Sequence, residues 1–297
     1  MVQLTPRERL PEWIRMGLPK EQYPQVHDLL RQRGLVTVCR EARCPNLNEC
    51  WSAGTATLML LGDTCTRRCS FCAVTTRSPQ GEVDSTEPSR VAEAVRAWGL
   101  SYVVLTQVCR DDLSDQGAAL MAETVRRVHA SSPGTRVEVL AGDLGGDREA
   151  LETLLAARPE VFAHNVETVA RLSPEVRDRR ASYERSLAVL QRAKEGPNAA
   201  RVTKSSVMLG LGERAEEVEA TLRDLRVAGV DLVTLGQYLR PGGPRFHIVA
   251  RYPDPSEFEA LGRFAEGLGF AGVAAGPMVR SSYRADELFH RAVSRGA

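Results

Sequence analysis

Residues 57–72 join a short apolar run to three closely spaced cysteines and read Thr57-Leu-Met-Leu-Leu61-Gly-Asp-Thr-Cys65-Thr-Arg-Arg-Cys69-Ser-Phe-Cys72. The run Thr57 to Leu61 has the length and composition of a buried strand. The cysteines occupy the segment directly after it. In parallel α/β folds such loops lie at the carboxyl end of the sheet, where functional sites are built. We therefore expect a ligand-binding loop at residues 65–72 of an α/β fold.

Beyond this loop, short β-rich runs alternate with amphipathic segments of helical spacing. The expected strands are Thr57 to Leu61, Tyr102 to Thr106, Arg136 to Leu140, Val161 to Asn165, Val202 to Met208 and Asp231 to Leu235. The expected helices are Glu87 to Trp98, Gln116 to Ala130, Asp147 to Ala157, Ser182 to Lys194 and Glu213 to Ala228. Strands separated by helices pair in parallel. Six such units fall short of the eight that close a barrel, which predicts a partial (β/α)6 TIM-type barrel, with Ala271 to Ala275 as an extra edge strand.

The two ends of the chain lie outside this alternation. Prolines interrupt residues 1–54, so we expect an N-terminal extension there. The barrel then covers residues 55–276, and residues 277–297 form a C-terminal tail. Both ends are candidate lids over the barrel mouth.

Composition excludes several classes of protein. The 297 residues are 43% hydrophobic and carry a formal net charge of +1, so no overall attraction to nucleic acid or to an anionic membrane is expected. The longest apolar runs are far shorter than the roughly 20 residues of a membrane helix. Residues 1–10 are charged and lack the apolar core of a signal peptide. We therefore expect a cytoplasmic protein without a membrane or nucleic-acid partner.

The three cysteines of residues 65–72 suit an iron–sulfur cluster. Cys65, Cys69 and Cys72 are able to ligate three irons of a 4Fe–4S cube, which leaves the fourth iron open. A structural zinc ion requires four closed ligands instead. An open iron is a place for a cofactor to bind. The alternative is a zinc-stabilised binding module without catalysis.

A second cysteine triplet lies just upstream. Cys39, Cys44 and Cys50 imply a second cluster, again with one iron that no cysteine of the triplet satisfies. The seventh cysteine, Cys109, follows the second expected strand. Its spacing fits either a fourth ligand or a passive buried thiol, and the two interpretations remain open.

The spacing Cys65-x3-Cys69-x2-Cys72 resembles the signature of the radical S-adenosylmethionine superfamily, as does the aromatic Phe71 before the last cysteine. The resemblance implies that the open iron chelates the methionine part of S-adenosylmethionine. An electron from the cluster then cleaves the sulfonium and yields a 5′-deoxyadenosyl radical.

The chain resembles one family within that superfamily, the lipoyl synthases. The resemblance rests on Cys39-Arg-Glu-Ala-Arg-Cys44-Pro-Asn-Leu-Asn-Glu-Cys50-Trp51 and on Arg280-Ser-Ser-Tyr283, and it extends over nearly the whole chain. It implies that Ser281 closes the second, auxiliary cluster as its fourth ligand. On an extended tail, Ser282 would point the other way.

Four residues depart from the family pattern: Gln107, Cys109, Gly142 and Ser206. None of them is at a ligand position. The departures bear on how substrate is handled and leave the cluster chemistry intact.

The resemblance further implies a reaction and its partners. Two sulfur atoms are inserted at C6 and C8 of an octanoyl group, which is bound to a lysine of a lipoyl carrier domain or of the glycine-cleavage H protein. The auxiliary cluster supplies the sulfur. An electron donor such as ferredoxin or flavodoxin and an iron–sulfur carrier protein are the implied helpers. The enzyme alternative is another radical sulfur-inserting or methylthio-transferring enzyme.

Polar residues near the ends of the expected strands are candidates for binding S-adenosylmethionine. Lys204 is placed to pair with the carboxylate, while Asn165 and Glu167 are placed to serve the amine or the ribose. For each, the alternative is a strand-end polar group satisfied within the fold. A further arginine-rich run is either a solvated face or a docking patch for an acidic protein substrate, and comprises Arg177, Arg179, Arg180 and Arg185.

Overall fold

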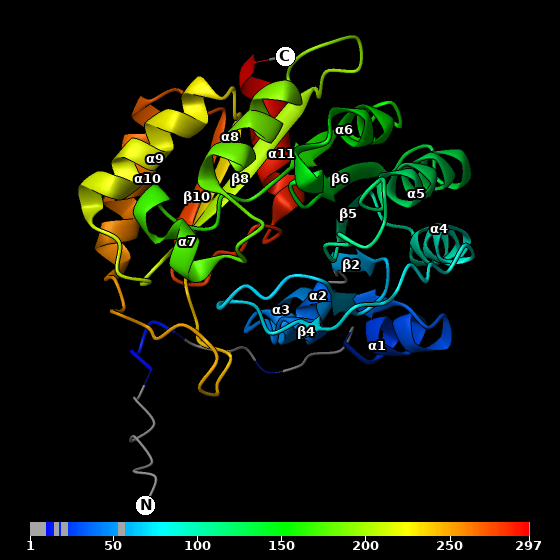
Figure 1. Ribbon diagram of the computed structural model, residues 1–297, viewed down its shortest axis with the longest axis horizontal. Coiled ribbons are helices and arrows are strands. Elements are labelled where there is room, and N and C mark those ends of the chain that lie inside the picture. The colour runs from blue at the N-terminus through cyan, green and yellow to red at the C-terminus, as the bar shows by residue number, and fades with distance from the viewer. Residues whose placement is uncertain (1–9, 15–17, 19–22, 53–56, 297) are drawn as a thin grey trace, which may run out of the picture.

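The computed structural model describes residues 10–14, 18, 23–52 and 57–296, and its centre is one large sheet (Figure 1). Within this part of the chain the sheet has eight strands in the order β1-β2-β5-β6-β7-β8-β9-β10. Their bounds are β1 Val36–Thr37, β2 Thr57–Leu60, β5 Tyr102–Gln107, β6 Arg136–Leu140, β7 Val161–Ala163, β8 Val202–Leu209, β9 Leu232–Gln237 and β10 Gly272–Gly276.

Every neighbouring pair from β2 to β10 is parallel, and β1 alone in this sheet runs antiparallel, beside β2. The α/β class and the open, partial barrel are thereby confirmed. The edge strand expected at residues 271–275 is present as β10, displaced by one residue. A separate two-stranded ribbon pairs β3 (Thr64–Cys65) with β4 (Thr75–Thr76) within the cysteine loop.

Helices cover the outer face of the sheet, with α4, α5 and α6 over one half and α8, α9 and α10 over the other (Figure 1). Their bounds are α4 Glu87–Trp98, α5 Ala118–Ser131, α6 Arg148–Leu155, α8 Tyr183–Arg192, α9 Ala215–Val227 and α10 Pro255–Gly267. The shorter or terminal helices are α1 Tyr23–Gln32, α2 Val38–Glu41, α3 Leu47–Ser52, α7 Ser173–Val176 and α11 Ala285–Gly296. None of the described helices has both the length and the apolar content to cross a bilayer.

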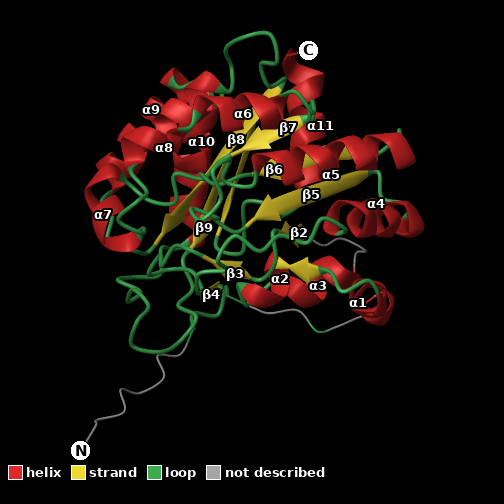
Figure 2. Cartoon of the chain, turned by 45° about the vertical axis from the view of Figure 1, so that its right-hand side comes forward, coloured by secondary structure: helices red, strands yellow, loops and turns green. Residues whose placement is uncertain are grey.

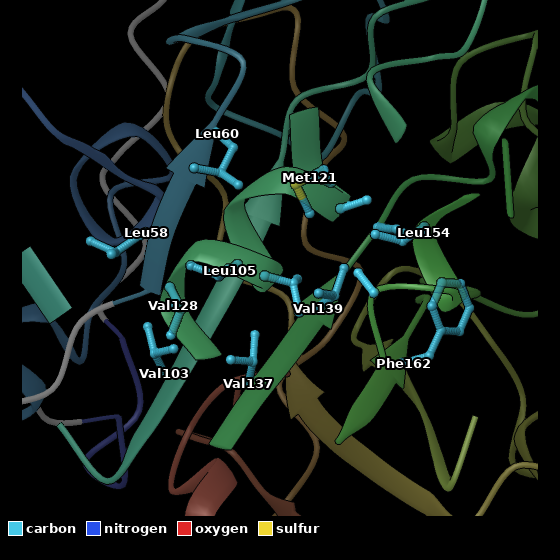
Figure 3. Close-up of a cluster of buried hydrophobic side chains, with 14 of the residues drawn as sticks. Leu58, Leu60, Val103, Leu105, Met121, Val128, Val137, Val139, Leu154 and Phe162 are labelled. Atoms are coloured by element: carbon cyan, nitrogen blue, oxygen red, sulfur yellow. The ribbon is translucent and has the colours of Figure 1, made fainter. Parts of the chain in front are cut away.

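The period-2 alternation of side chains decides which residues form the core. Leu58 of β2, Leu105 of β5 and Val139 of β6 are buried in one apolar cluster that includes Met121 of α5 (Figure 3). Each such side chain stabilises the fold by about 1.5 to 3 kcal/mol. The intervening residues of the same strands face the barrel interior, where the polar groups of the site are found.

The parallel strands all point to one end of the barrel, where the loops gather beyond the arrowheads (Figure 2). This end is the mouth. Helix α4 shows how the chain returns to the other end: Pro88 lies in its first turn, and Gly99 ends it with a φ of 69°.

The N-terminal extension and the C-terminal segment meet beside β2. Asn46 Nδ2 donates to Met278 O over 2.6 Å, Thr57 Oγ1 donates to Ser282 Oγ over 2.9 Å, and Tyr283 donates from its hydroxyl to Glu49 over 2.7 Å. These bonds link the segment after β10 to the far edge of the open sheet.

The expectation that the whole tail forms a lid over the mouth is wrong for α11. Phe289 of that helix lies 5.9 Å from the Tyr102 ring and under the Arg136 guanidinium, at 5.6 Å. Tyr102 and Arg136 are the first residues of β5 and β6. Helix α11 therefore packs at the amino ends of the strands, opposite the mouth. An apolar face at its period of 3.6 residues explains why it is buried there.

Candidate active site at the barrel mouth

The cysteine loop is held at the mouth by backbone hydrogen bonds to three other segments. Thr66 donates to the Cys109 carbonyl over 3.0 Å, and Ser70 donates to the Val176 carbonyl over 2.9 Å. The His247 amide in turn donates to the Ser70 carbonyl over 2.8 Å. The loop is thereby fixed from the β5, β7 and β9 sides, as a rigid metal site requires.

Cys65, Cys69 and Cys72 all line one cavity of about 350 Å³ at the mouth. No three His, Cys, Asp or Glu side chains of the described segments are arranged to share a single metal ion. Ligands of a 4Fe–4S cube each bind a different iron and therefore surround a cluster-sized space. Three cysteines around one cavity fit that requirement.

The thiols differ in acidity. A hydrogen bond from Cys109, more than any other contact, lowers the pKa of Cys65 to about 7. Burial raises the pKa of Cys69 to about 11 and that of Cys72 to about 12. In the metal-free protein at neutral pH the last two are thiols, so binding of iron displaces their protons.

Arg67, inside the loop, is tied to two carboxylates that follow other strands. Its Nε and Nη2 atoms both donate to the Asp111 carboxylate, with a shortest distance of 2.8 Å, and Nη2 also lies 2.7 Å from Asp143 Oδ1. The Arg67 side chain is only 4% exposed. A buried bidentate arginine fixes direction as well as distance, so this residue orients the loop between Cys65 and Cys69.

The second triplet lines an adjoining cavity of about 440 Å³, in which Cys39, Cys44 and Cys50 face Arg280 and Ser282. Cys39 lies in α2, Cys50 lies in α3 and Cys44 lies in the turn between them, where its amide donates to the Cys39 carbonyl over 3.0 Å. Cys39 and Cys44 also line the first cavity. The two cavities therefore share a wall that contains Cys39 and Cys44.

The segment that carries the two serines is a turn, residues 281–284, that leads into α11. The extended tail expected here is therefore wrong, and strand-like alternation does not separate the two hydroxyls. Ser281 lines the first cavity together with Cys39 and Cys44. Ser282 borders both cavities and accepts the Thr57 hydroxyl.

Asn165 and Glu167 line the first cavity, as does Phe71. Asn165 Oδ1 is buried without a hydrogen-bond partner in the described structure. Glu167 has a φ of 69°, a strained value for a residue with a side chain, and its backbone is held by bonds to Ser206 and Met208. Burial raises the pKa of the Glu167 carboxyl.

Lys204 takes a different position from the one expected. It is 1% exposed, and its ammonium lies 2.8 Å from Glu138, which also accepts the Tyr102 hydroxyl over 2.6 Å. It is absent from the residues that line the cavity. Lys204 lies inside the barrel and not at the cavity. Its expected contact with the carboxylate of S-adenosylmethionine is therefore corrected.

Two further polar residues of the cavity are not among the expected S-adenosylmethionine contacts. Gln107 and Gln237, the last residues of β5 and β9, line it with a buried, unpaired Oε1 each among the described residues. A polar residue at the end of a buried strand was the available signal. These acceptors suit the amine, hydroxyl and adenine N–H donors of S-adenosylmethionine.

Cys109 also lines the first cavity and is hydrogen-bonded to Cys65. A Cβ atom on Gly142 would lie 3.1 Å from its sulfur. Cys109 is therefore in contact with the loop that holds the first triplet, and the absence of a side chain at residue 142 leaves room for it.

Most arginines of the run after α7 already bond to other groups of the protein. Arg177 is buried and donates to Ser186 over 2.8 Å, while Arg180 pairs with Asp178 over 2.9 Å. Arg185 donates to the Arg180 carbonyl. Only Arg179 projects without such a partner in the described chain, so the run does not form a docking patch of four arginines.

Comparison with known proteins identifies the family. The model of the Radical SAM superfamily matches residues 59–225. The lipoyl synthase of Thermus thermophilus is 54% identical over 287 residues, which cover 96% of this chain and 88% of the relative. The lipoyl synthase of Pyrobaculum arsenaticum is 54% identical over 286 residues and 96% of both chains.

Solved structures agree on the fold. The FeFe-hydrogenase maturase HydG of Carboxydothermus hydrogenoformans superposes with a TM-score of 0.58 over 93% of this chain and 69% of its own, at 15% identity. Methylornithine synthase superposes with a TM-score of 0.56 over 86% of this chain and 75% of its own, at 15% identity. The cysteine loop and the two adjoining cavities agree with these relatives. The chain belongs to the lipoyl synthase family of radical S-adenosylmethionine enzymes.

Proposed function

We propose that this enzyme inserts two sulfur atoms at C6 and C8 of an octanoyl chain held in amide linkage by a lysine of a lipoyl carrier domain or glycine-cleavage H protein. The observation that carries the proposal is the shared wall: Cys39 and Cys44 line both cavities. A radical formed in one cavity acts only at short range. A sulfur source in the adjoining cavity is therefore close enough to trap the substrate carbon.

We assign the ligands as follows. One 4Fe–4S cluster is held by Cys65, Cys69 and Cys72, and the auxiliary cluster by Cys39, Cys44 and Cys50 with Ser281. When bound, these clusters supply respectively the electron that cleaves S-adenosylmethionine and the sulfur that is inserted. On this assignment residues 1–54 and 277–297 serve the auxiliary cluster and residues 55–276 the radical chemistry.

The remaining side chains bind and position. Asn165, Gln107 and Gln237 present unpaired acceptors to the donors of S-adenosylmethionine, and Phe71 supplies an apolar wall. The position of Glu167 beside Asn165 suits the amine. Enclosure by these residues would keep a radical close to its substrate and away from other C–H and S–H bonds. A ferredoxin or flavodoxin is the proposed electron donor, and an iron–sulfur carrier protein the proposed source of a new auxiliary cluster.

The test separates the two cysteine sets. Anaerobically reconstituted enzyme is incubated with S-adenosylmethionine, a reductant and an octanoyl-lysine carrier peptide, and the peptide mass is followed. We expect a gain of two sulfur atoms. Replacing Cys39, Cys44 and Cys50 by Ala is expected to preserve reductive cleavage of S-adenosylmethionine while abolishing the mass gain. Replacing Cys65, Cys69 and Cys72 by Ala is expected to abolish both. A folded auxiliary-triplet variant that no longer cleaves S-adenosylmethionine would contradict separate roles.

A further inference from the structure

The exposed arginines of this enzyme differ in how their charge is compensated. On α5, α9 and α10, some of them pair with a carboxylate one helical turn away. The pairs are Arg127 with Glu123 on α5, Arg223 with Glu219 on α9 and Arg263 with Glu259 on α10. In each pair the carboxylate compensates the charge of the arginine.

Five exposed arginines around the mouth have no carboxylate of the described chain within 4.0 Å: Arg43, Arg68, Arg179, Arg240 and Arg245. Where their guanidinium groups are bonded, the acceptors are backbone carbonyls. Arg43 donates to Pro241 over 3.0 Å, and Arg240 donates to Gly243 over 2.9 Å. A carbonyl orients a guanidinium without neutralising it. These five arginines, here called the arginine rim, keep their positive charge.

The arginine rim is continuous in space. The Arg43 contact joins the turn after α2 to the loop after β9, and Arg245 in that loop reaches the Cys72 carbonyl at 3.5 Å. The amide of Arg68 donates to Asp178, the neighbour of Arg179, over 2.8 Å. The rim therefore follows the edge of the cysteine loop from one side of the mouth to the other. Asp178 is itself paired with Arg180. The exposed carboxylate nearest to Arg179 in sequence is Glu175.

The loop after β9 adds an apolar element to the rim. Its His247 is anchored from both sides, because its ring contacts the Leu211 carbonyl at 3.1 Å and its own carbonyl accepts the Tyr238 hydroxyl over 2.8 Å. Ile248 beside this anchor is 63% exposed. Arg245 stacks on Phe246 at 4.2 Å. An anchored loop that displays an isoleucine between cations has the composition of a protein-binding edge.

We propose that the arginine rim is the docking surface for the acylated carrier domain, and that it recognises a carrier with acidic side chains around the modified lysine. This inference rests on the proposed function. An acyl chain tethered to a lysine reaches the cavity only if the body of its carrier lies against the mouth. The rim is the surface that the carrier then covers. Because the whole chain has a net charge of only +1, this local field is what steers an acidic partner.

The experiment compares a tethered substrate with a minimal one. Arg179→Glu/Arg240→Glu reverses two rim charges whose side chains do not touch the cysteines. Arg158→Glu/Arg201→Glu is the matched control, because both arginines are exposed, unpaired in the described chain and located before β7 and β8, at the opposite end of the sheet. Each reconstituted enzyme is assayed with an octanoylated H protein and with a short, uncharged octanoyl-lysine peptide.

We expect the rim variant to show a KM for the octanoylated H protein raised about tenfold and a weaker dependence on salt, with kcat and the peptide reaction close to wild type. The control is expected to match the wild type on both substrates. Equal KM values for the H protein in all three enzymes, or an equal loss on peptide and H protein, would overturn the docking assignment. Absence of sulfur insertion into either substrate by the wild type would instead overturn the proposed function.

Discussion

Arg67 Nη2 lies 2.7 Å from Asp143 Oδ1, and the two side chains are 4% and 0% exposed. One residue belongs to the cysteine loop and the other to the segment after β6, so this contact joins the cluster loop to the barrel. Although burial opposes ionisation, Arg67 holds the pKa of the Asp143 carboxyl below its usual value.

Replacing Asp143 by Asn is expected to lower the free energy of unfolding by about 3 kcal/mol, because breaking a buried pair leaves Arg67 with Asp111 as its one remaining carboxylate partner in the described structure. Urea denaturation of the metal-free protein measures the change. The iron content of the reconstituted variant should fall as well, since Arg67 orients the loop. Glu123→Gln, which removes an exposed pair with Arg127, is the control and is expected to have a much smaller effect. Equal urea midpoints for the two variants would contradict the role of the contact.

Cys109 is expected to be a neighbour of the cluster loop and not an iron ligand. Its sulfur is engaged with Cys65, which already belongs to the first triplet. Cys109→Ala should therefore retain all iron after anaerobic reconstitution. Iron analysis and visible absorption give the measurement. A loss of about four iron atoms per chain would instead make Cys109 a cluster ligand.

Ser281 is expected to be the weak ligand of the auxiliary cluster. An alkoxide is a harder and weaker ligand for these irons than a thiolate, so Ser281→Cys should keep both clusters and radical formation but slow sulfur transfer. Ser281→Ala should lose auxiliary iron. The product mass and the iron content report the two effects.

Ser282 is the control position, although its replacement is expected to lower the stability of the protein. Ser282→Ala removes the hydrogen bond from Thr57, at a cost to stability of about 1 kcal/mol, and should leave iron content unchanged. Thr57→Val removes the same bond from the other side and should reproduce that loss. If auxiliary iron depends on Ser282 and not on Ser281, the ligand assignment is reversed.

The buried His164 is expected to make the stability of the fold decrease in acid. Burial lowers its pKa to about 4, from 6.5. Its ring is held between the Ala141 carbonyl at 3.0 Å and the Ser186 hydroxyl at 2.8 Å. Between these two pH values the unfolded chain binds a proton that the folded protein excludes, so stability falls as the pH falls. The contribution amounts to about 3 kcal/mol.

The check is the unfolding free energy of the metal-free protein between pH 7 and pH 4, compared with that of His164→Gln. The wild type should lose more stability than the variant over this interval, because glutamine does not titrate. Parallel curves would show that His164 is not the group responsible.

Those elements of the fold whose signal is local could be predicted from the order of the amino acids alone. The spacing of Cys65, Cys69 and Cys72 is readable without a structure because three ligands on one loop are neighbours in the chain. The strands could also be predicted from local sequence, because burial on both faces gives each of them a continuous apolar run. The bounds expected for helix α4, Glu87 to Trp98, agree with the structure to the residue, and Gly99 marks its end.

The contacts between side chains that are distant in the chain could not be predicted in this way. Lys204 pairs with Glu138, on a strand 66 residues away in sequence, and no local pattern records that two interior positions of β6 and β8 face each other. The same holds for the wall shared by the two cavities and for α11, which lies below the barrel and not over its mouth. Contacts of this kind arise from the closure of the sheet and the register of its strands. They depend on where every element is placed, so a local stretch of sequence does not specify them.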